Sequence, residues 1–146
     1  MSAAPVIAGY ASLFGVRDRS GDRVLPGAFR ASLKSRGTAR IAMLWQHDPA
    51  QPIGRWERLG EDRRGLWVIG RLLPGVTLGR EAAALIDAGA VSGLSIGFQA
   101  RRAQKSRQGA ERLLSDIDLW EVSVVTFPQV DGARVRIVRP NGAVSI

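Results

Sequence analysis

Short apolar runs separated by polar, glycine-rich segments predict that most of this chain forms β-strands. Within the runs, apolar and polar residues often alternate, and the breaks are rich in Gly, Pro, Asp and Arg, as in strands joined by turns. The runs 53–59 and 66–73 flank a polar turn, which predicts a β-hairpin. We expect strands over residues 6–14, 41–45, 53–59, 66–73, 91–100 and 113–127, with a last edge strand over 135–138.

Two segments indicate helices instead. Pro26 stands where a helix can begin and Gly37 where it can end, which predicts a helix over 26–36. Further along the chain, Thr77 is expected to cap a helix that stops at Gly89.

These elements predict a single domain over residues 1–146. The chain has no repeat of the solenoid or propeller kind, and its length suits one hydrophobic core. The polar segments 15–27 and 101–111 are expected to be exposed loops. Several strands with two helices indicate a β-rich α+β fold, which we expect to be a closed or nearly closed β-barrel with a few surrounding helices.

The composition narrows the chemistry. The 146 residues include no Cys, which excludes disulfides, thiolate metal sites, iron–sulfur clusters and a cysteine nucleophile. With His47 as the only histidine, a poly-histidine site is excluded too, although carboxylates alone could hold Mg or Ca. We expect no metal and no cofactor. The N-terminus lacks a basic n-region and no apolar run approaches the ~20 residues that span a bilayer, so we expect no signal peptide and no membrane partner.

The chain is strongly basic, with 21 Lys plus Arg against 13 Asp plus Glu and a formal charge of +8. Such a charge attracts polyanions, either nucleic acid or an acidic protein surface. Lys34 and Lys105 are the only lysines. An excess of arginine suits phosphate or carboxylate recognition, but a GC-rich coding sequence also produces it. The densest basic stretch, 101–107, has no aromatic residue to stack bases, which favours a solvated loop.

The segment 91–98 carries the most informative pattern. Because a strand sends alternate side chains to opposite faces, one face here is apolar and the other holds a hydroxyl between two glycines. Glycine weakens a strand, so Gly93 and Gly97 suggest that a substrate peptide approaches the backbone beside a nucleophilic Ser95. A bulge or a tight barrel corner next to an ordinary serine explains the same pattern.

A nucleophilic serine needs a base to take its proton, and histidine is the usual one. His47 follows the apolar run 41–45 at a strand end, where an imidazole can be oriented, although an ordinary loop histidine fits this position equally. The rival base is a lysine. Lys34 lies on an expected surface helix and Lys105 in a charged loop, so neither is expected to be buried enough to lose its proton.

Glu121, together with Ser123, interrupts the apolar face of the strand 113–127. A carboxylate among apolar side chains is costly unless it is paired. Glu121 is therefore either half of a buried ion pair, most simply with an Arg, or the third member of a triad with His47, and the pattern favours neither. Asp48 is a weaker candidate for that third position, because Asp-Pro more often sets a turn.

Five blocks stand out along the chain: GYASLF at 9–14, DRVLPGAF at 22–29, LWQHD at 44–48 with PIG at 52–54, SGLSIGF at 92–98 and LWEVSVVTFP at 119–128. In kind and in order they resemble the blocks of the prohead proteases of tailed phages, which are related in fold to the herpesvirus assemblins. The resemblance covers residues 6–128, and the shared order of the blocks makes it specific.

The resemblance implies a serine endopeptidase. Such an enzyme cleaves the scaffold or the N-terminal scaffolding region of the major capsid protein, and often itself, inside the assembling procapsid in the bacterial cytoplasm. Carried over by position, Ser95 is the nucleophile, His47 the general base and Glu121 the third member of the triad. The herpesvirus relatives have a second histidine at that third position, and this chain has none. In the assemblin-like fold an arginine assists the oxyanion, so Arg101 and Arg102 are the candidates here.

The same resemblance suggests partners. We expect a substrate strand to add to the sheet edge near Ser95, with Gly93 and Gly97 leaving room for its side chains. Capsid or scaffold protein is the expected substrate, and nucleic acid is not expected as a ligand. A homodimer through the helix around 80–88 stays open, and 129–146 is expected to hold a C-terminal strand and tail. The compact, arginine-rich form also resembles the proteases of gene transfer agents.

Two other functions fit the sequence. A noncatalytic capsid-assembly or nucleic-acid-binding module would use the basic surface, including 101–107. An esterase or amidase would use the same triad on small substrates. The spacing of Gly93, Ser95 and Gly97 matches a nucleophile elbow, but no helix follows it, which argues against an α/β-hydrolase.

Overall fold

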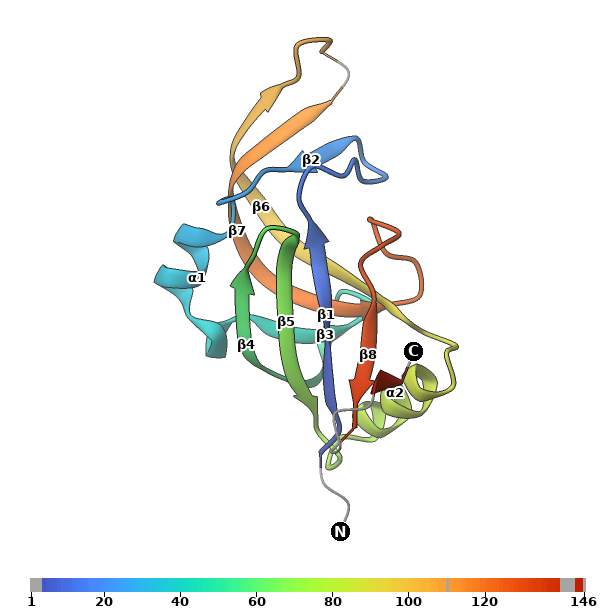
Figure 1. The fold of residues 1–146 in the computed structure, drawn as a ribbon. Coiled ribbons are helices and arrows are strands. Elements are labelled where there is room, and N and C mark those ends of the chain that lie inside the picture. Colours follow the sequence, from blue (N-terminus) through green and yellow to red (C-terminus); the bar gives the residue numbers. More distant parts are fainter. Residues whose placement is uncertain (1–3, 110, 140–143, 146) are drawn as a thin grey trace.

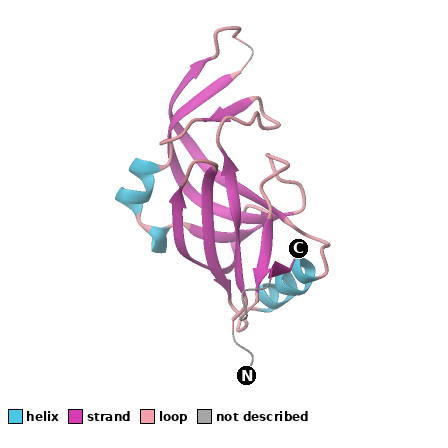
Figure 2. Cartoon of the chain, viewed as in Figure 1, coloured by secondary structure: helices cyan, strands magenta, loops and turns pink. Residues whose placement is uncertain are grey.

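A single nine-stranded β-sheet organises the residues that this computed structural model describes, 4–109, 111–139 and 144–145 (Figure 1). The helices α1 (Arg30–Arg36) and α2 (Thr77–Asp87) lie on opposite sides of the molecule (Figure 2). The strands are β1 (Val6–Leu13), β2 (Asp22–Val24), β3 (Ala42–Trp45), β4 (Asp48–Glu61), β5 (Gly65–Leu72), β6 (Gly93–Lys105), β7 (Arg112–Val125), β8 (Val135–Val138) and β9 (Val144–Ser145).

Strand β7 joins the two parts of the sheet. One edge of β7 pairs with β6 in antiparallel fashion, while its other edge pairs in parallel first with β2 and then with β3. From β3 the sheet continues through β4, β5, β1, β8 and β9. The β6–β7 hairpin extends past the other strands at one end of the molecule (Figure 1).

The sheet curls until its two ends meet, but no ladder among the described strands closes it. One isolated bridge, between Gly93 and Arg134, joins the start of β6 to the segment before β8. Beside it, Leu94 N–H donates to the carbonyl of Ala133 at 2.9 Å. Beyond Leu94 the edge of β6 borders a cavity instead of another strand. The β-rich α+β fold is thus confirmed, whereas the closed barrel is not.

Apolar side chains from the strands and helices fill the interior, as the alternating sequence pattern predicts. Burying each large side chain stabilises the fold by about 1.5–3 kcal/mol. Helix α2 packs against β4, β5 and β8 and buries Gly79, Ala82 and Ile86, with Val76 rather than Thr77 as its N-cap residue. The largest fully buried side chains are Phe29, Ile7, Met43, Ile53, Leu66, Leu72, Leu94, Leu114, Ile117, Leu119, Val68 and Val122.

Several expected boundaries differ from the structure. Helix α1 begins at Arg30 instead of residue 26, because Gly27 has φ +89°, which lies outside the helical region. Residues 101–105 continue β6 and do not open a loop. The expected loop 15–27 contains the short strand β2. Among the described residues, no helix combines the length and the hydrophobicity needed to cross a bilayer.

Candidate active site

Two facing pairs of residues on β6 and β7 form the floor of the site. Ser95 lies opposite Ser123, and Gly97 lies opposite Glu121. Directly opposed residues of an antiparallel pair send their side chains to the same face of the sheet. One face of the hairpin therefore gathers two hydroxyls and one carboxylate around a position without a side chain.

Ser95 is buried, with 2% of its surface exposed, and its Oγ has no hydrogen-bond partner among the described residues. Buried polar atoms are nearly always paired, so an unpaired serine hydroxyl calls for an explanation. Ser95 lines a cavity of about 360 Å³ that also contacts His47, the end of β1, the 16–20 loop and the segment 129–130. The cavity therefore borders both the serine and the histidine.

His47 lies in a two-residue turn between β3 and β4. Trp45 pairs with Asp48 across the turn, and the central residues Gln46 and His47 have φ of 53° and 62°. Positive φ at both central positions is typical of a type I′ turn, and glycine or asparagine usually occupies these positions. The backbone here thus adopts a costly conformation that carries the histidine to the cavity.

Glu121 lies beside the imidazole of His47. Its Oε2 lies 2.6 Å from His47 Nδ1, and it forms no ion pair with an arginine among the described residues. The Glu121 side chain is 11% exposed, against 41% for His47. A neutral His47 that donates Nδ1–H to this carboxylate keeps Nε2 free to accept a proton. The pair has the arrangement of a general base and the acid that orients it.

At both glycines around Ser95, other protein atoms occupy the space where a side chain would be. A Cβ on Gly97 would lie 2.2 Å from Glu121 Oε2, so the missing side chain makes room for the carboxylate. A Cβ on Gly93 would lie 2.7 Å from the carbonyl oxygen of Val125 and 2.8 Å from Cδ of Pro128. Gly93 therefore leaves no open space where its side chain would be, and it does not line the cavity. Gly97 does line the cavity.

Arg101 and Arg102 are not brought to the cavity. At about 3.3 Å per residue, Arg101 lies roughly 20 Å along β6 from Ser95. Its guanidinium is 3.3 Å from Asp118, which also accepts a 2.9 Å hydrogen bond from Arg36. Hydrogen bonds from Arg36 and then from Trp120 hold the pKa of Asp118 below its usual range. Arg102 borders a separate hollow beside α1. Neither arginine therefore lines the cavity that Ser95 borders, and both lie on the α1 side of the hairpin.

The other rival residues also lie outside the cavity. Asp48 accepts a 2.9 Å hydrogen bond from Ala50 N–H, which is the turn-setting role that Asp-Pro suggested. Lys34 is on α1 and Lys105 is at the far end of β6, and neither lines the cavity.

Sequence reasoning missed the role of Ser123. Its Oγ donates to Glu121 Oε1 at 2.6 Å and accepts the His47 backbone N–H at 3.0 Å. A signal was present, because Ser123 follows Glu121 by two residues on a strand and therefore shares its face.

The sequence is similar to those of known capsid proteases. A family model described as caudovirus prohead serine protease matches residues 2–143. The prohead protease of Enterobacteria phage HK97 is 35% identical over 136 residues, which are 92% of this chain and 60% of that protein. The chain thus spans 60% of the length of this relative.

The fold is similar to those of solved viral proteases. The bacteriophage T4 capsid assembly protease superposes with a TM-score of 0.70 at 17% identity, over 87% of this chain and 85% of that one. The Kaposi's sarcoma herpesvirus protease, in complex with a hexapeptide phosphonate inhibitor, has a TM-score of 0.63 at 13% identity, over 94% of this chain and 66% of that one. At these identities the likeness concerns the fold.

Proposed function

Because the chain belongs to the caudovirus prohead serine protease family, we propose that it is a serine endopeptidase of capsid maturation. Its substrate is the scaffold or the N-terminal scaffolding region of the major capsid protein, inside the assembling procapsid in the host cytoplasm. Self-cleavage is a second expected reaction.

One observation carries the proposal. The 2.6 Å contact between His47 Nδ1 and Glu121 Oε2 accompanies a buried Ser95 hydroxyl that no described residue engages, and His47 and Ser95 line the same cavity. These are the three roles that serine proteolysis requires: a nucleophile, a base, and an acid that orients the base.

The proposed mechanism is acyl transfer. Ser95 Oγ attacks the scissile carbonyl carbon while His47 Nε2 takes the hydroxyl proton, and the carboxylate of Glu121 stabilises the imidazolium that forms. The imidazolium then protonates the leaving amine. His47 next takes a proton from water, which attacks the acyl carbon. The bond to Ser95 Oγ then breaks, and His47 returns the proton to Oγ, which releases the acid product and restores the hydroxyl.

The open edge of β6 supports binding of the substrate as an added strand. No described strand pairs with β6 on the side away from β7. Leu94, Ser95, Ile96 and Phe98 of this strand line the cavity. A peptide hydrogen-bonded along this edge would bring its scissile carbonyl close to Ser95.

Co-expression with the neighbouring capsid gene product tests the proposal, with the masses of both proteins measured after induction. Ser95→Ala and His47→Ala are expected to slow cleavage by at least about 10³-fold and to leave the fold intact. Glu121→Gln is expected to slow cleavage less. Ser92→Ala is the matched control, because Ser92 lies close by but its hydroxyl is bonded to Arg134 at 3.0 Å.

Unchanged processing by Ser95→Ala would contradict the nucleophile assignment. An unfolded Glu121→Gln protein would instead indicate that Glu121 serves stability and not catalysis. Absence of processing by the wild-type chain, together with tight and salt-sensitive binding to DNA, would favour a noncatalytic module.

A further inference from the structure

Ser123 connects the carboxylate of Glu121 to the backbone of His47 through one hydroxyl group. It is fully buried on β7, with 0% of its surface exposed. Its Oγ donates to Glu121 Oε1 at 2.6 Å and accepts the backbone N–H of His47 at 3.0 Å. The carboxylate that holds the imidazole and the turn that carries the imidazole therefore share a single contact.

These two hydrogen bonds hold two different parts of the site in place, the carboxylate and the turn. A carboxylate on a rotatable side chain can turn its oxygens, and the bond to Oε1 leaves Oε2 facing His47 Nδ1. The bond from the His47 N–H holds the two-residue turn, where φ is 62°, against β7. A hydroxyl has one proton to donate, so giving it to Glu121 leaves its lone pairs to accept from His47.

We propose that Ser123 is a positioning residue, which sets the geometry between Glu121 and His47 without touching the substrate. This inference rests on the proposed triad. Ser123 acts through Glu121, because its proton goes to that carboxylate, and it holds the contact between Glu121 and the imidazole in place.

The chain offers a matched control on another element. Ser32 in α1 is also fully buried, and its Oγ accepts the backbone N–H of Leu119 in β7 at 2.9 Å. Ser32→Ala and Ser123→Ala each remove a buried hydroxyl that accepts a backbone N–H of the same fold. Only Ser123 also donates to the carboxylate beside His47.

The reactivity of Ser95 provides a readout that needs no protein substrate. Diisopropyl fluorophosphate phosphorylates an activated serine: an O–P bond forms, fluoride leaves, and His47 takes the hydroxyl proton. The labelling rate is followed by intact mass. We expect Ser123→Ala to slow labelling by about 10- to 100-fold, the loss for a hydrogen bond to a charged group. Ser32→Ala should label at the wild-type rate.

Two further measurements separate positioning from simple structural support. His47 is the only histidine, so its ring signals need no assignment by mutation. The Nδ1–H proton resonance should be observed in the wild type and in Ser32→Ala, and should be lost to solvent exchange in Ser123→Ala. In a Glu121→Gln background, Ser123→Ala should slow labelling little further, since both changes break the same connection.

Specific outcomes would overturn the inference. Ser123 does not act through the carboxylate if Ser123→Ala is labelled as fast as the wild type. The same conclusion follows if the double variant with Glu121→Gln slows labelling by the product of the two single effects. If Ser95→Ala takes up the label as the wild type does, the proposed triad itself fails, and that result is distinct from a failure of Ser123 alone.

Discussion

At the scale of single residues, the position of the Glu121 carboxylate depends on the space that Gly97 leaves. The two residues face each other across β6 and β7. The nearest atoms to a Cβ at Gly97 would be Oε2, Cδ and Cγ of Glu121, at 2.2 to 2.7 Å. All three belong to one side chain, which can move more easily than backbone. A larger residue here should displace the carboxylate rather than disrupt the strand.

We therefore expect Gly97→Ala to impair chemistry more than stability. The displaced carboxylate loses its contact with His47, which should slow labelling of Ser95 by diisopropyl fluorophosphate at least about tenfold. The free energy of unfolding should change by no more than about 1 kcal/mol, because the better strand preference of Ala offsets part of the crowding. Labelling rate and denaturant unfolding on the same protein give both quantities.

Gly75→Ala is the control for that substitution. No atom lies within 4 Å of a Cβ at Gly75, and its φ is not positive. Its labelling rate should equal that of the wild type. A Gly97→Ala protein that reacts normally with the reagent would show that Glu121 needs no such space.

At the scale of elements, the β3–β4 turn has to be held in place because its backbone is unfavourable. Gln46 and His47 both have positive φ, which costs a residue with a side chain about 1–2 kcal/mol. Hydrogen bonds to β7 offset this cost. Gln46 N–H donates to Val124 at 2.9 Å, and the Gln46 amide exchanges two bonds with Thr126, at 2.7 and 3.1 Å.

Thr126→Val tests this support. The substitution keeps the shape of the side chain and removes the hydroxyl that accepts from Gln46 Nε2. We expect the protein to lose about 0.5–1.5 kcal/mol of unfolding free energy. Thr126→Ser keeps the hydroxyl and should retain most of that stability. Equal stability of the Val and Ser variants in urea unfolding would contradict a supporting role for this bond.

The turn also illustrates where sequence reasoning stops. The apolar run 41–45 and the histidine after it are enough to predict a strand that delivers His47 to its end. The tight turn is not predictable, because Gln-His lacks the Asn-Gly or Gly signal of a type I′ hairpin. Its conformation comes from contacts with Ser123 and Thr126, which are far along the chain.

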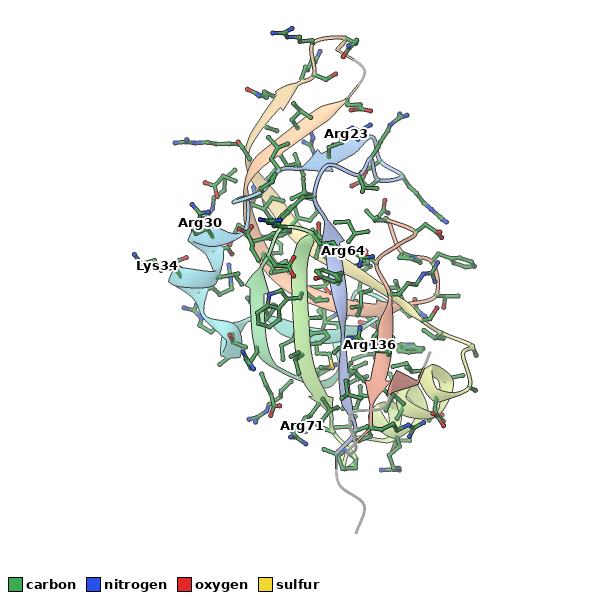
Figure 3. All side chains as sticks on the ribbon, in the orientation of Figure 1. Arg23, Arg30, Lys34, Arg64, Arg71 and Arg136 are labelled. Atoms are coloured by element: carbon green, nitrogen blue, oxygen red, sulfur yellow. The ribbon has the colours of Figure 1, made fainter. Side chains whose placement is uncertain are left out.

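At the scale of the whole molecule, the basic charge is spread over the fold. The basic residues labelled in Figure 3 come from α1, from three strands and from the β4–β5 turn, and apart from the α1 pair Arg30 and Lys34 they lie on different parts of the molecule. Some of the charge is neutralised locally, as in the bonds of Arg112 with Asp22 and of Arg23 with Glu111. Glu111 accordingly has a lowered pKa, caused chiefly by the hydrogen bond from Arg23. The net charge of +8 therefore attracts acidic partners in general and does not form one localised binding patch on these labelled residues.

Long-range pairing limited what the sequence could predict about the site. Alternation within one strand placed Ser95 between two glycines and put Glu121 with Ser123, since these are local relations. The register that sets Ser95 opposite Ser123 and Gly97 opposite Glu121 depends on how β6 meets β7, which local pattern does not determine. For this reason the sequence pattern predicts only that Gly97 makes room for substrate, whereas its nearest neighbour in the fold is the carboxylate.

The open edge of the sheet leads to a prediction about the assembled enzyme and substrate. Leu94 N–H already donates to Ala133 on the side of β6 away from β7. Successive residues of a strand alternate in direction, so the N–H of Ile96 points to the same side, at the cavity. The experiment uses uncleaved capsid protein bound to the Ser95→Ala variant. If substrate adds there as a strand, binding should slow hydrogen exchange of the Ile96 amide at least about tenfold. The exchange rate of the Leu94 amide should stay unchanged. Residue-resolved exchange with and without saturating substrate measures both amides, and an Ile96 amide that exchanges equally fast in the complex would contradict substrate pairing on this edge.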